Sequence, residues 1–371
     1  MEGLEKIRQN FPVTKNRVYL NHAAHSPLPK PVRDVMWKFV NEFSEYGDAM
    51  DFDDGKSSFA RLVNASEDEV ALVENTSMGL NIIANMLNYS SDSNVVTTDL
   101  EYPSAVYPWM KRKLGVTLRY VGDKAGKILL EDLERAVDDK TVAVAISHVE
   151  YANGFRFDLK AVSEIAHKYG AYLIVDAIQS LGALSVDVKR DDVDFLTAGC
   201  YKWMLGPPGA GYLYVRGGLI ENFAPPLIGW ASVKPEIFET IDTWEIHHLN
   251  LSETASRFEV GTPSRVSFCG AAAALKLLLN TGIQNIEKRV LKLTDFLIRR
   301  LMEKSLKLQT PLEPEYRSGI VNFLIDDPQD RTKKLAEKGI IVSARSHGIR
   351  VSPHFYNTEE EIDKLVEEAT K

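Results

Sequence analysis

The chain has 371 residues, of which 44% are hydrophobic and 26% charged, and its 44 Lys and Arg against 52 Asp and Glu give a net charge of −8. This composition is typical of a globular protein, the acidic balance disfavours a nucleic-acid surface, which would need a basic stripe, and no stretch approaches about 18 consecutive apolar residues, which excludes a transmembrane helix. The first residues lack the apolar core of a signal peptide, and two cysteines, Cys200 and Cys269, are too few for a disulfide framework, so we expect a cytoplasmic protein.

From about residue 70 the chain alternates short apolar runs with amphipathic stretches. Near-continuous apolar strands separated by helices indicate a mostly parallel sheet that is covered on both faces. We therefore expect an α/β large domain over residues 18–255. The runs interpreted as strands are VALVEN (70–75), NVVTTDL (94–100), TVAVAISHV (141–149), AYLIVDA (171–177), DFLTAG (194–199) and GYLYVR (211–216).

After about residue 260 the pattern changes to that of a smaller α+β domain, expected over residues 256–371. Thr358 and Glu361 have the spacing of a capping box, which marks the start of a last helix. The N-terminal arm, residues 1–17, is expected to join this domain or to pack against a partner subunit. The elements expected here are helices at 270–282, 286–304 and 359–369 and short strands at 319–325 and 339–345.

Polar residues follow several of the expected strands, and in a parallel α/β sheet ligands bind outside the carboxyl ends of the strands. Several kinds of chemistry therefore converge on one edge of the sheet. The Cys and His residues show no zinc-type spacing, so no metal site is expected there. The residues at this edge are Thr76 and Ser77, Glu101 and Tyr102, His148 to Asn153, Asp176 and Gln179, and Lys202.

These residue types suit pyridoxal 5′-phosphate. A desolvated lysine such as Lys202 forms an imine with an aldehyde, and an aspartate such as Asp176 can hold a protonated pyridine nitrogen. Thr76 and Ser77 at a helix start offer hydroxyl and N–H groups to a phosphate, and Tyr102 can stack on a flat ring. Each feature alone is more often a cap, a turn or a packing residue, so the prediction depends on their combination.

The segments IVDAIQS and TAGCYKWMLGPPGAGYLYV resemble the class V aminotransferase family of fold-type-I pyridoxal-phosphate enzymes, which includes cysteine desulfurases, kynureninases and isopenicillin-N-epimerase-like proteins. The resemblance extends from about residue 18 to the C-terminus. It implies a seven-stranded, mostly parallel sheet covered by helices, a small α+β C-terminal domain, and a homodimer with the cofactor site at the subunit interface. The other matching segments are VYLNHAAHSPLP (18–29), ENTSMGLN (74–81), EYPSAVYPW (101–109), RFEVGTPS (257–264) and GIRVSPHFYNTEEEID (348–363).

The resemblance also implies roles for individual residues. Lys202 takes the position of the Schiff-base lysine and proton shuttle, Asp176 that of the partner of the pyridine nitrogen, and Gln179 that of a contact to the phenolic oxygen of the ring. Tyr102 takes the stacking position, and Arg350 is expected to bind the substrate carboxylate. Further cofactor contacts are expected from Thr76, Ser77, Asn153, Tyr201 and, across the subunit boundary, Trp230 and Thr262.

Two residues of the N-terminal loop, Ala24 and His25, are expected to contact the substrate. His25 and His347 could each serve as a second base at the substrate entrance, but both are interpreted first as ordinary loop histidines. The sequence leaves the side chain of the substrate open.

The resemblance implies an enzyme that acts on an α-amino acid through an external aldimine. Transamination or epimerisation is the first expectation, because residues 339–352 lack the acceptor cysteine of a desulfurase and Tyr102 replaces the usual histidine. Carbon–sulfur lyase or desulfurase-like β-elimination, or kynureninase-like cleavage, is the alternative. A non-catalytic cofactor-binding module is disfavoured, because it predicts the loss of Lys202 or Arg350 and both are present.

Overall fold

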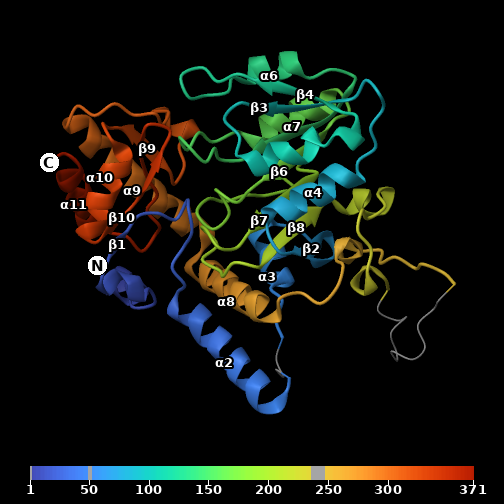
Figure 1. Ribbon diagram of the computed structural model, residues 1–371, viewed down its shortest axis with the longest axis horizontal. Helices are drawn as coiled ribbons and strands as arrows, with labels where there is room; N and C mark the ends of the chain where they lie inside the picture. The colour runs from blue at the N-terminus through green and yellow to red at the C-terminus, as the bar shows by residue number, and fades with distance from the viewer. Residues whose placement is uncertain (1, 49–51, 235–246) are drawn as a thin grey trace.

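The computed structural model describes residues 2–48, 52–234 and 247–371 (Figure 1). Its largest unit is a seven-stranded sheet in the order β2-β8-β7-β6-β5-β3-β4, which is parallel except that β8 runs antiparallel to β2 and β7. The predicted mostly parallel sheet is therefore confirmed. The strands are β2 (Val70–Val73), β3 (Asn94–Thr98), β4 (Thr117–Val121), β5 (Thr141–Ser147), β6 (Tyr172–Asp176), β7 (Phe195–Gly199) and β8 (Gly211–Val215).

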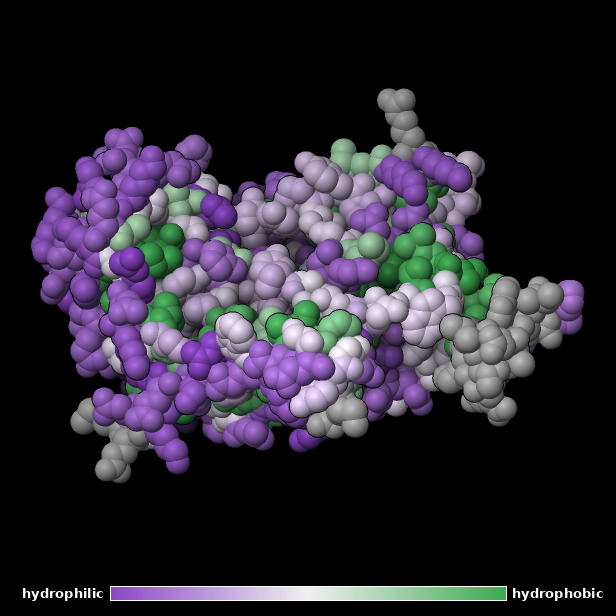
Figure 2. All heavy atoms as spheres, turned by 60° about the horizontal axis from the view of Figure 1, so that its bottom comes forward, coloured by the Kyte–Doolittle hydropathy of each residue, from purple (hydrophilic) through white to green (hydrophobic). Residues whose placement is uncertain are grey.

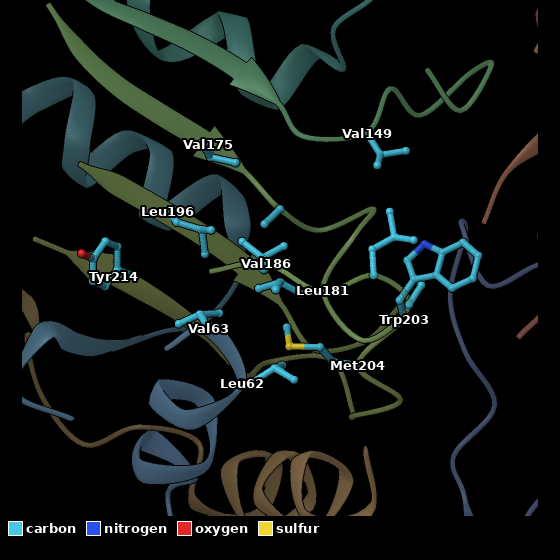
Figure 3. Close-up of a cluster of buried hydrophobic side chains, with 14 of the residues drawn as sticks. Leu62, Val63, Val149, Val175, Leu181, Val186, Leu196, Trp203, Met204 and Tyr214 are labelled. Carbon is cyan, nitrogen blue, oxygen red and sulfur yellow. The ribbon is translucent and has the colours of Figure 1, made fainter. Parts of the chain in front are cut away.

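The apolar runs are continuous because both faces of this sheet are buried. Successive strand residues point to opposite faces, so Val175 of β6 belongs to one hydrophobic core and its neighbour Ile174 to another. In Figure 3, Val175 and Leu196 lie on adjacent strands above Leu62 and Val63 of α3 (Lys56–Val63).

Helices cover the sheet, and two of them extend the molecule away from it. α2 (Lys30–Tyr46) packs along α8 (Arg265–Thr281), and its far end projects at the bottom of Figure 1. The helices around the sheet, besides α3, are α4 (Thr76–Met86), α5 (Pro103–Val106), α6 (Leu130–Ala136) and α7 (Leu159–Lys168). Short 3-10 segments lie at Pro12–Lys15, Glu67–Glu69, Tyr107–Met110, Arg112–Leu114, Gly217–Asn222, Trp230–Ser232, Ala255–Phe258 and Pro314–Tyr316.

The small domain packs helices on a three-stranded antiparallel sheet in the order β11-β12-β9. The predicted capping box is present, because the Thr358 side chain accepts a hydrogen bond from the Glu361 N–H and the Glu361 carboxylate accepts one from the Thr358 N–H. Among the described residues, no single helix has the length and apolarity to cross a membrane, and α8 and α9 pass that test only as a pair bent by 81°. The elements are α9 (Ile283–Glu303), β9 (Val321–Leu324), α10 (Pro328–Glu337), β11 (Ser343–Arg345), β12 (Gly348–Val351) and α11 (Glu359–Ala369).

The N-terminal segment lies against the small domain. Arg8 of α1 (Glu2–Arg8) donates hydrogen bonds to the Tyr356 carbonyl at 2.7 Å and to Glu361 at 2.8 Å. β1 (Val18–Tyr19) pairs in parallel with β10 (Ile340–Ile341). This pairing attaches the first residues of the predicted large domain to the small one, so the boundary at residue 18 stays a prediction.

We predict that an added methyl group lowers the free energy of unfolding by different amounts at two glycines with left-handed backbones. A Cβ on Gly182 (φ +99°) would lie 2.2 Å from the Trp203 carbonyl oxygen, whereas one on Gly170 (φ +74°) would meet nothing within 4 Å. Gly170→Ala should therefore cost about 1–2 kcal/mol of unfolding free energy, and Gly182→Ala about 3 kcal/mol or more, because the turn after Lys202 must also shift. Urea unfolding followed by circular dichroism measures both, and equal losses would contradict the close contact.

Candidate active site

Asp176 lies at the carboxyl end of β6, in the middle of the sheet, where it pairs with Ser147 of β5 and Thr197 of β7. Its carboxylate is 3% exposed and accepts a hydrogen bond from the Ile178 N–H at 2.9 Å. Burial raises the pKa of Asp176 to about 6, although this hydrogen bond and the charge of Lys202 lower it. At neutral pH the carboxylate is therefore mostly ionised and available to a cationic partner.

Lys202 lies in the turn after β7 and is half-buried. Burial lowers the pKa of Lys202 to about 8; the charge of Asp176 raises it, and the charges of Arg350 and Arg345 lower it further. The Ser26 hydroxyl donates a hydrogen bond to the Lys202 carbonyl at 2.6 Å and so fixes the turn to the N-terminal loop. An appreciable fraction of the amine is neutral near pH 8, and a neutral amine is the form that adds to a carbonyl or accepts a proton.

Aromatic rings surround this amine. Its Nζ atom lies 5.9 Å from the ring centroid of Tyr102 and 5.8 Å from that of Tyr201. Tyr151 packs edge to face on Tyr102 with 5.1 Å between the ring centroids. Tyr102 and Tyr201 thus lie beside the Lys202 amine, and their contacts with the cofactor stay predictions. Tyr151 belongs to the run of residues 148–153 that the sequence places at this edge, but the sequence gives it no role of its own.

A second group of polar atoms lies at the start of α4. The Asn75 side chain caps the helix by accepting a hydrogen bond from the Met78 N–H. The Thr76 hydroxyl oxygen accepts one from the Gly199 N–H at 2.9 Å, which joins the helix start to the end of β7, and the Ser77 hydroxyl donates to Ser104 at 2.9 Å. The first N–H groups of a helix lack partners within it, so these residues and the helix dipole favour an anion here.

Arg350 brings a positive charge from the small domain to this edge. It is 2% exposed, and one Nη donates a hydrogen bond to the Tyr151 carbonyl at 2.7 Å. Burial lowers the pKa of Arg350 to about 10, and the charge of Arg345 lowers it further. The Nε–H is buried and has no hydrogen-bond partner among the described residues. A buried donor without a partner is costly, and an anionic substrate group would satisfy it.

Two predicted cofactor contacts already make structural hydrogen bonds. Gln179 donates to the Ala23 carbonyl and accepts from the Trp203 indole, both at 3.0 Å. Asn153 donates to the Gly126 carbonyl at 2.7 Å and accepts from the Phe155 N–H at 3.0 Å. Both amides hold backbone segments together, and their contacts with the cofactor stay predictions.

The remaining predicted residues lie on the surface or near it. Ala24 is half-buried and His25 is exposed, both in the N-terminal loop that contacts the lysine turn. Thr262 is exposed and lines a groove of about 240 Å³. Trp230 is 58% exposed, and its Nε1 lies 3.4 Å from where a Cβ on Gly261 would sit. Their contact with the cofactor of a partner subunit stays a prediction.

Two buried glutamates lie beside Asp176; the sequence places both at this edge of the sheet but gives neither a role. Glu101 accepts hydrogen bonds from the N–H and hydroxyl of Ser147, at 2.5 and 2.6 Å. Glu150 accepts one from the Thr98 hydroxyl at 3.2 Å, and its second oxygen has no partner among the described residues. Burial raises the pKa of Glu101 to about 8 and that of Glu150 well above its usual range. Glu150, which has fewer donors, is the group we expect to carry a proton.

The residues at this edge fit pyridoxal 5′-phosphate. Lys202 presents an amine with a lowered pKa. Asp176 is a buried carboxylate without a close ion pair among the described residues, so a protonated ring nitrogen would neutralise it. Thr76 and Ser77 start a helix at the position where a phosphate is favoured, and the exposed Tyr102 ring lies near the lysine.

Comparisons with known proteins agree with this geometry. The sequence model described as aminotransferase class-V matches residues 18–365. The "uncharacterized aminotransferase YcbU" of Bacillus subtilis is 32% identical over 99% of this chain and 98% of its own length. A "probable cysteine desulfurase" of Pyrococcus abyssi is 30% identical over 98% of this chain and 96% of its own length.

Solved structures with similar folds include two kinds of sulfur enzyme. A cysteine desulfurase from Thermococcus onnurineus, in its apo form, has a TM-score of 0.86 and 27% identity, and the alignment covers 98% of this chain and 96% of that one. The cystine C–S lyase C-DES has a TM-score of 0.88 and 22% identity over 97% of this chain and 99% of its own. The second similarity concerns the fold alone.

We predict that Glu150→Gln makes stability less dependent on pH. The folded-state pKa of Glu150 lies above the ordinary 4.5, so its protonation supports the fold fully below about pH 4.5 and this support is lost as the pH rises towards the folded pKa. Glutamine stays neutral, so the stability advantage of the variant should grow between pH 5 and pH 8.

Urea unfolding at both pH values measures this change. The exposed Glu164→Gln is the control and should follow the wild type at both pH values. A Glu150→Gln advantage that is the same at pH 5 and pH 8 would mean that Glu150 is ionised in the folded protein.

Proposed function

Because the chain belongs to the aminotransferase class-V family, we propose that it is a pyridoxal-phosphate-dependent lyase that cleaves a carbon–sulfur bond in an α-amino acid. Dependence on the cofactor follows from the family and from the residues around Lys202. The choice of reaction rests on one observation. Relatives of this chain are named cysteine desulfurases, but both cysteines of this chain are buried, so neither offers an accessible thiol beside Lys202 and Arg350.

Four residues of the sheet edge are expected to bind the cofactor. Thr76 and Ser77 would hold the phosphate, Asp176 the ring nitrogen, and Tyr102 one face of the ring. When bound, pyridoxal phosphate supplies an electron sink that stabilises negative charge on the Cα of an amino acid. Asp176 keeps a proton on the ring nitrogen because its own carboxylate is ionised at neutral pH.

Lys202 and Arg350 act on the substrate. Arg350 would bind the α-carboxylate through two parallel N–H groups of its guanidinium, one to each carboxylate oxygen. This contact orients the Cα–H bond, and the neutral amine of Lys202 accepts the proton at Nζ. The Tyr102 ring lies beside this amine and packs on Tyr151.

The burial of the two cysteines supports a proposal for how sulfur leaves. Cys200 is 0% and Cys269 is 4% exposed, and burial raises the pKa of both thiols. A buried thiol of raised pKa is a poor nucleophile, so neither is suited to accept sulfur as a persulfide. We therefore propose release of sulfide or of a thiol directly to solvent. The cytoplasmic location expected from these two cysteines stays a prediction.

Transamination, the first expectation together with epimerisation, becomes the second candidate. A relative with 32% identity is named an aminotransferase, and the residue expected to stack on the ring is Tyr102 instead of the histidine usual in desulfurases. Transamination, epimerisation and elimination all begin with the removal of the same proton, so the described lysine and arginine serve each of them.

We also propose a homodimer in which Thr262 and Trp230 approach the site of the partner. α2 leaves large apolar side chains in contact with solvent, and Figure 2 shows hydrophobic patches on the side of the molecule that carries this helix. Burial of such a surface by a second copy is favourable. The exposed apolar residues of α2 are Val35, Trp37, Val40, Phe43 and Tyr46.

Products formed from L-cysteine and its S-substituted derivatives test the reaction. We expect sulfide or a thiol together with pyruvate and ammonia, and we expect Lys202→Ala to lose both these products and the visible absorbance of the lysine-bound cofactor. The double variant Cys200→Ala/Cys269→Ala should keep the products. Alanine as the main product, with loss of activity in the cysteine variant, would support a desulfurase instead, and a keto acid that retains the sulfur would support transamination.

Light scattering of the purified protein tests the dimer. We expect twice the 41.6 kDa mass of one chain. Introducing a charge into α2 by Trp37→Asp or Phe43→Asp should shift the mass towards one chain, because these side chains are 61% and 50% exposed in the single chain. Tyr120→Asp, at a 50% exposed position on the edge strand β4, is the control and should leave the mass unchanged.

A further inference from the structure

A second arginine lies beside Arg350 on the small-domain hairpin. In the β11–β12 register, Ser343 is opposite Arg350 and Arg345 is opposite Gly348. Residues 343 and 345 of one strand point to the same face, so Arg345 and Arg350 are diagonal neighbours on one face of the hairpin. Side chains at such positions are within reach of each other.

The hairpin holds Arg345 in place. Asn322 of β9 donates hydrogen bonds to the Arg345 carbonyl at 3.1 Å and to the Ala152 carbonyl at 2.9 Å, which connects the hairpin to the loop that precedes Asn153. The turn residues Ser346 and His347 both have left-handed backbones, with φ of +47° and +66°. Such backbones are unfavourable for residues other than glycine, so the surrounding hydrogen bonds define this turn and the side chain next to it.

Positive charge accumulates here without a matching carboxylate. Among the described residues, the guanidinium groups of Arg345 and Arg350 donate to the backbone carbonyls of Ala344 and Tyr151, and neither forms an ion pair. The charge of Arg345 lowers the pKa of Arg350 and also that of Lys202. Like charges on one face of a hairpin are unfavourable, and an anion between them or beside them would relieve the repulsion.

The two arginines differ in depth. Arg350 is 2% exposed and lies against the large domain, whereas Arg345 is exposed at the end of β11. One α-carboxylate needs only one guanidinium fork, so a second, more exposed guanidinium is suited to a group farther along the substrate.

We propose that Arg345 is a specificity-determining residue that binds a second anionic group, such as a carboxylate at the far end of the substrate side chain, while Arg350 binds the α-carboxylate. This inference rests on the proposed function and names its substrate class: sulfur-containing amino acids with an acidic group beyond the sulfur.

Two ligands that lack the α-amine test the inference without turnover. 3,3′-Thiodipropionate has a carboxylate on each side of its sulfur, and 3-(methylthio)propionate has only one. Calorimetric titration of the holoenzyme should show the dicarboxylate binding about 10- to 100-fold more tightly, which is the value of one charge-assisted contact. Arg345→Gln should abolish this preference, Arg345→Lys should retain part of it, and Arg350→Gln should weaken both ligands.

The outcomes separate the possible roles of Arg345. Equal weakening of both ligands by Arg345→Gln would mean that the two arginines share one carboxylate and would overturn the inference, as would a wild-type protein without preference or a preference that survives Arg345→Gln. Unfolding of Arg345→Gln at the wild-type temperature shows that the fold is intact. Failure of the proposed lyase reaction would appear in the products from cysteine derivatives and leaves this binding comparison valid.

Discussion

The arrangement of the site depends on one turn, the segment that carries Lys202 away from β7. Three separate parts of the chain hydrogen-bond to it. Ser26 of the N-terminal loop donates to the Lys202 carbonyl, the Trp203 indole donates to Gln179 after β6, and His354 of the small domain donates to the Trp203 carbonyl at 2.9 Å. Burial lowers the pKa of His354 to about 4, so it stays neutral near physiological pH. The amine can be desolvated because its backbone is fixed from three sides.

Charge is segregated around this turn. The carboxylate of Asp176 lies at the sheet edge, whereas the arginines Arg345 and Arg350 come from the small domain. Besides burial, the charge of Asp176 raises the pKa of Lys202 and the charges of the two arginines lower it. The small-domain arginines therefore add to the effect of burial in lowering the pKa of the lysine.

The sheet and its catalytic edge were predictable because both depend on local patterns. Apolar runs of strand length, separated by helices, define a sheet covered on both faces, and the carboxyl ends of parallel strands then bring Asp176 and Lys202 to one edge. Tyr151 and Glu101 are also placed at this edge by the sequence, but their contacts depend on loop conformation and burial, which have no periodic signal in the sequence. Arg345 became a candidate only with the register of the hairpin, since a shift of one residue would turn its side chain to the other face.

The hydrogen-bond partners of buried side chains also could not be predicted from the sequence. Gln179 and Asn153 match the family by position, yet both amides bind backbone groups of distant segments. The same limit explains why the reaction was harder to predict than the cofactor. Proton removal at Cα needs only the lysine, the aspartate and an electron sink, which the sheet edge determines. The step that follows proton removal depends on the side chains of the small-domain hairpin, which contains two arginines and no cysteine. This combination favours a substrate that carries its own leaving sulfur and an additional negative charge.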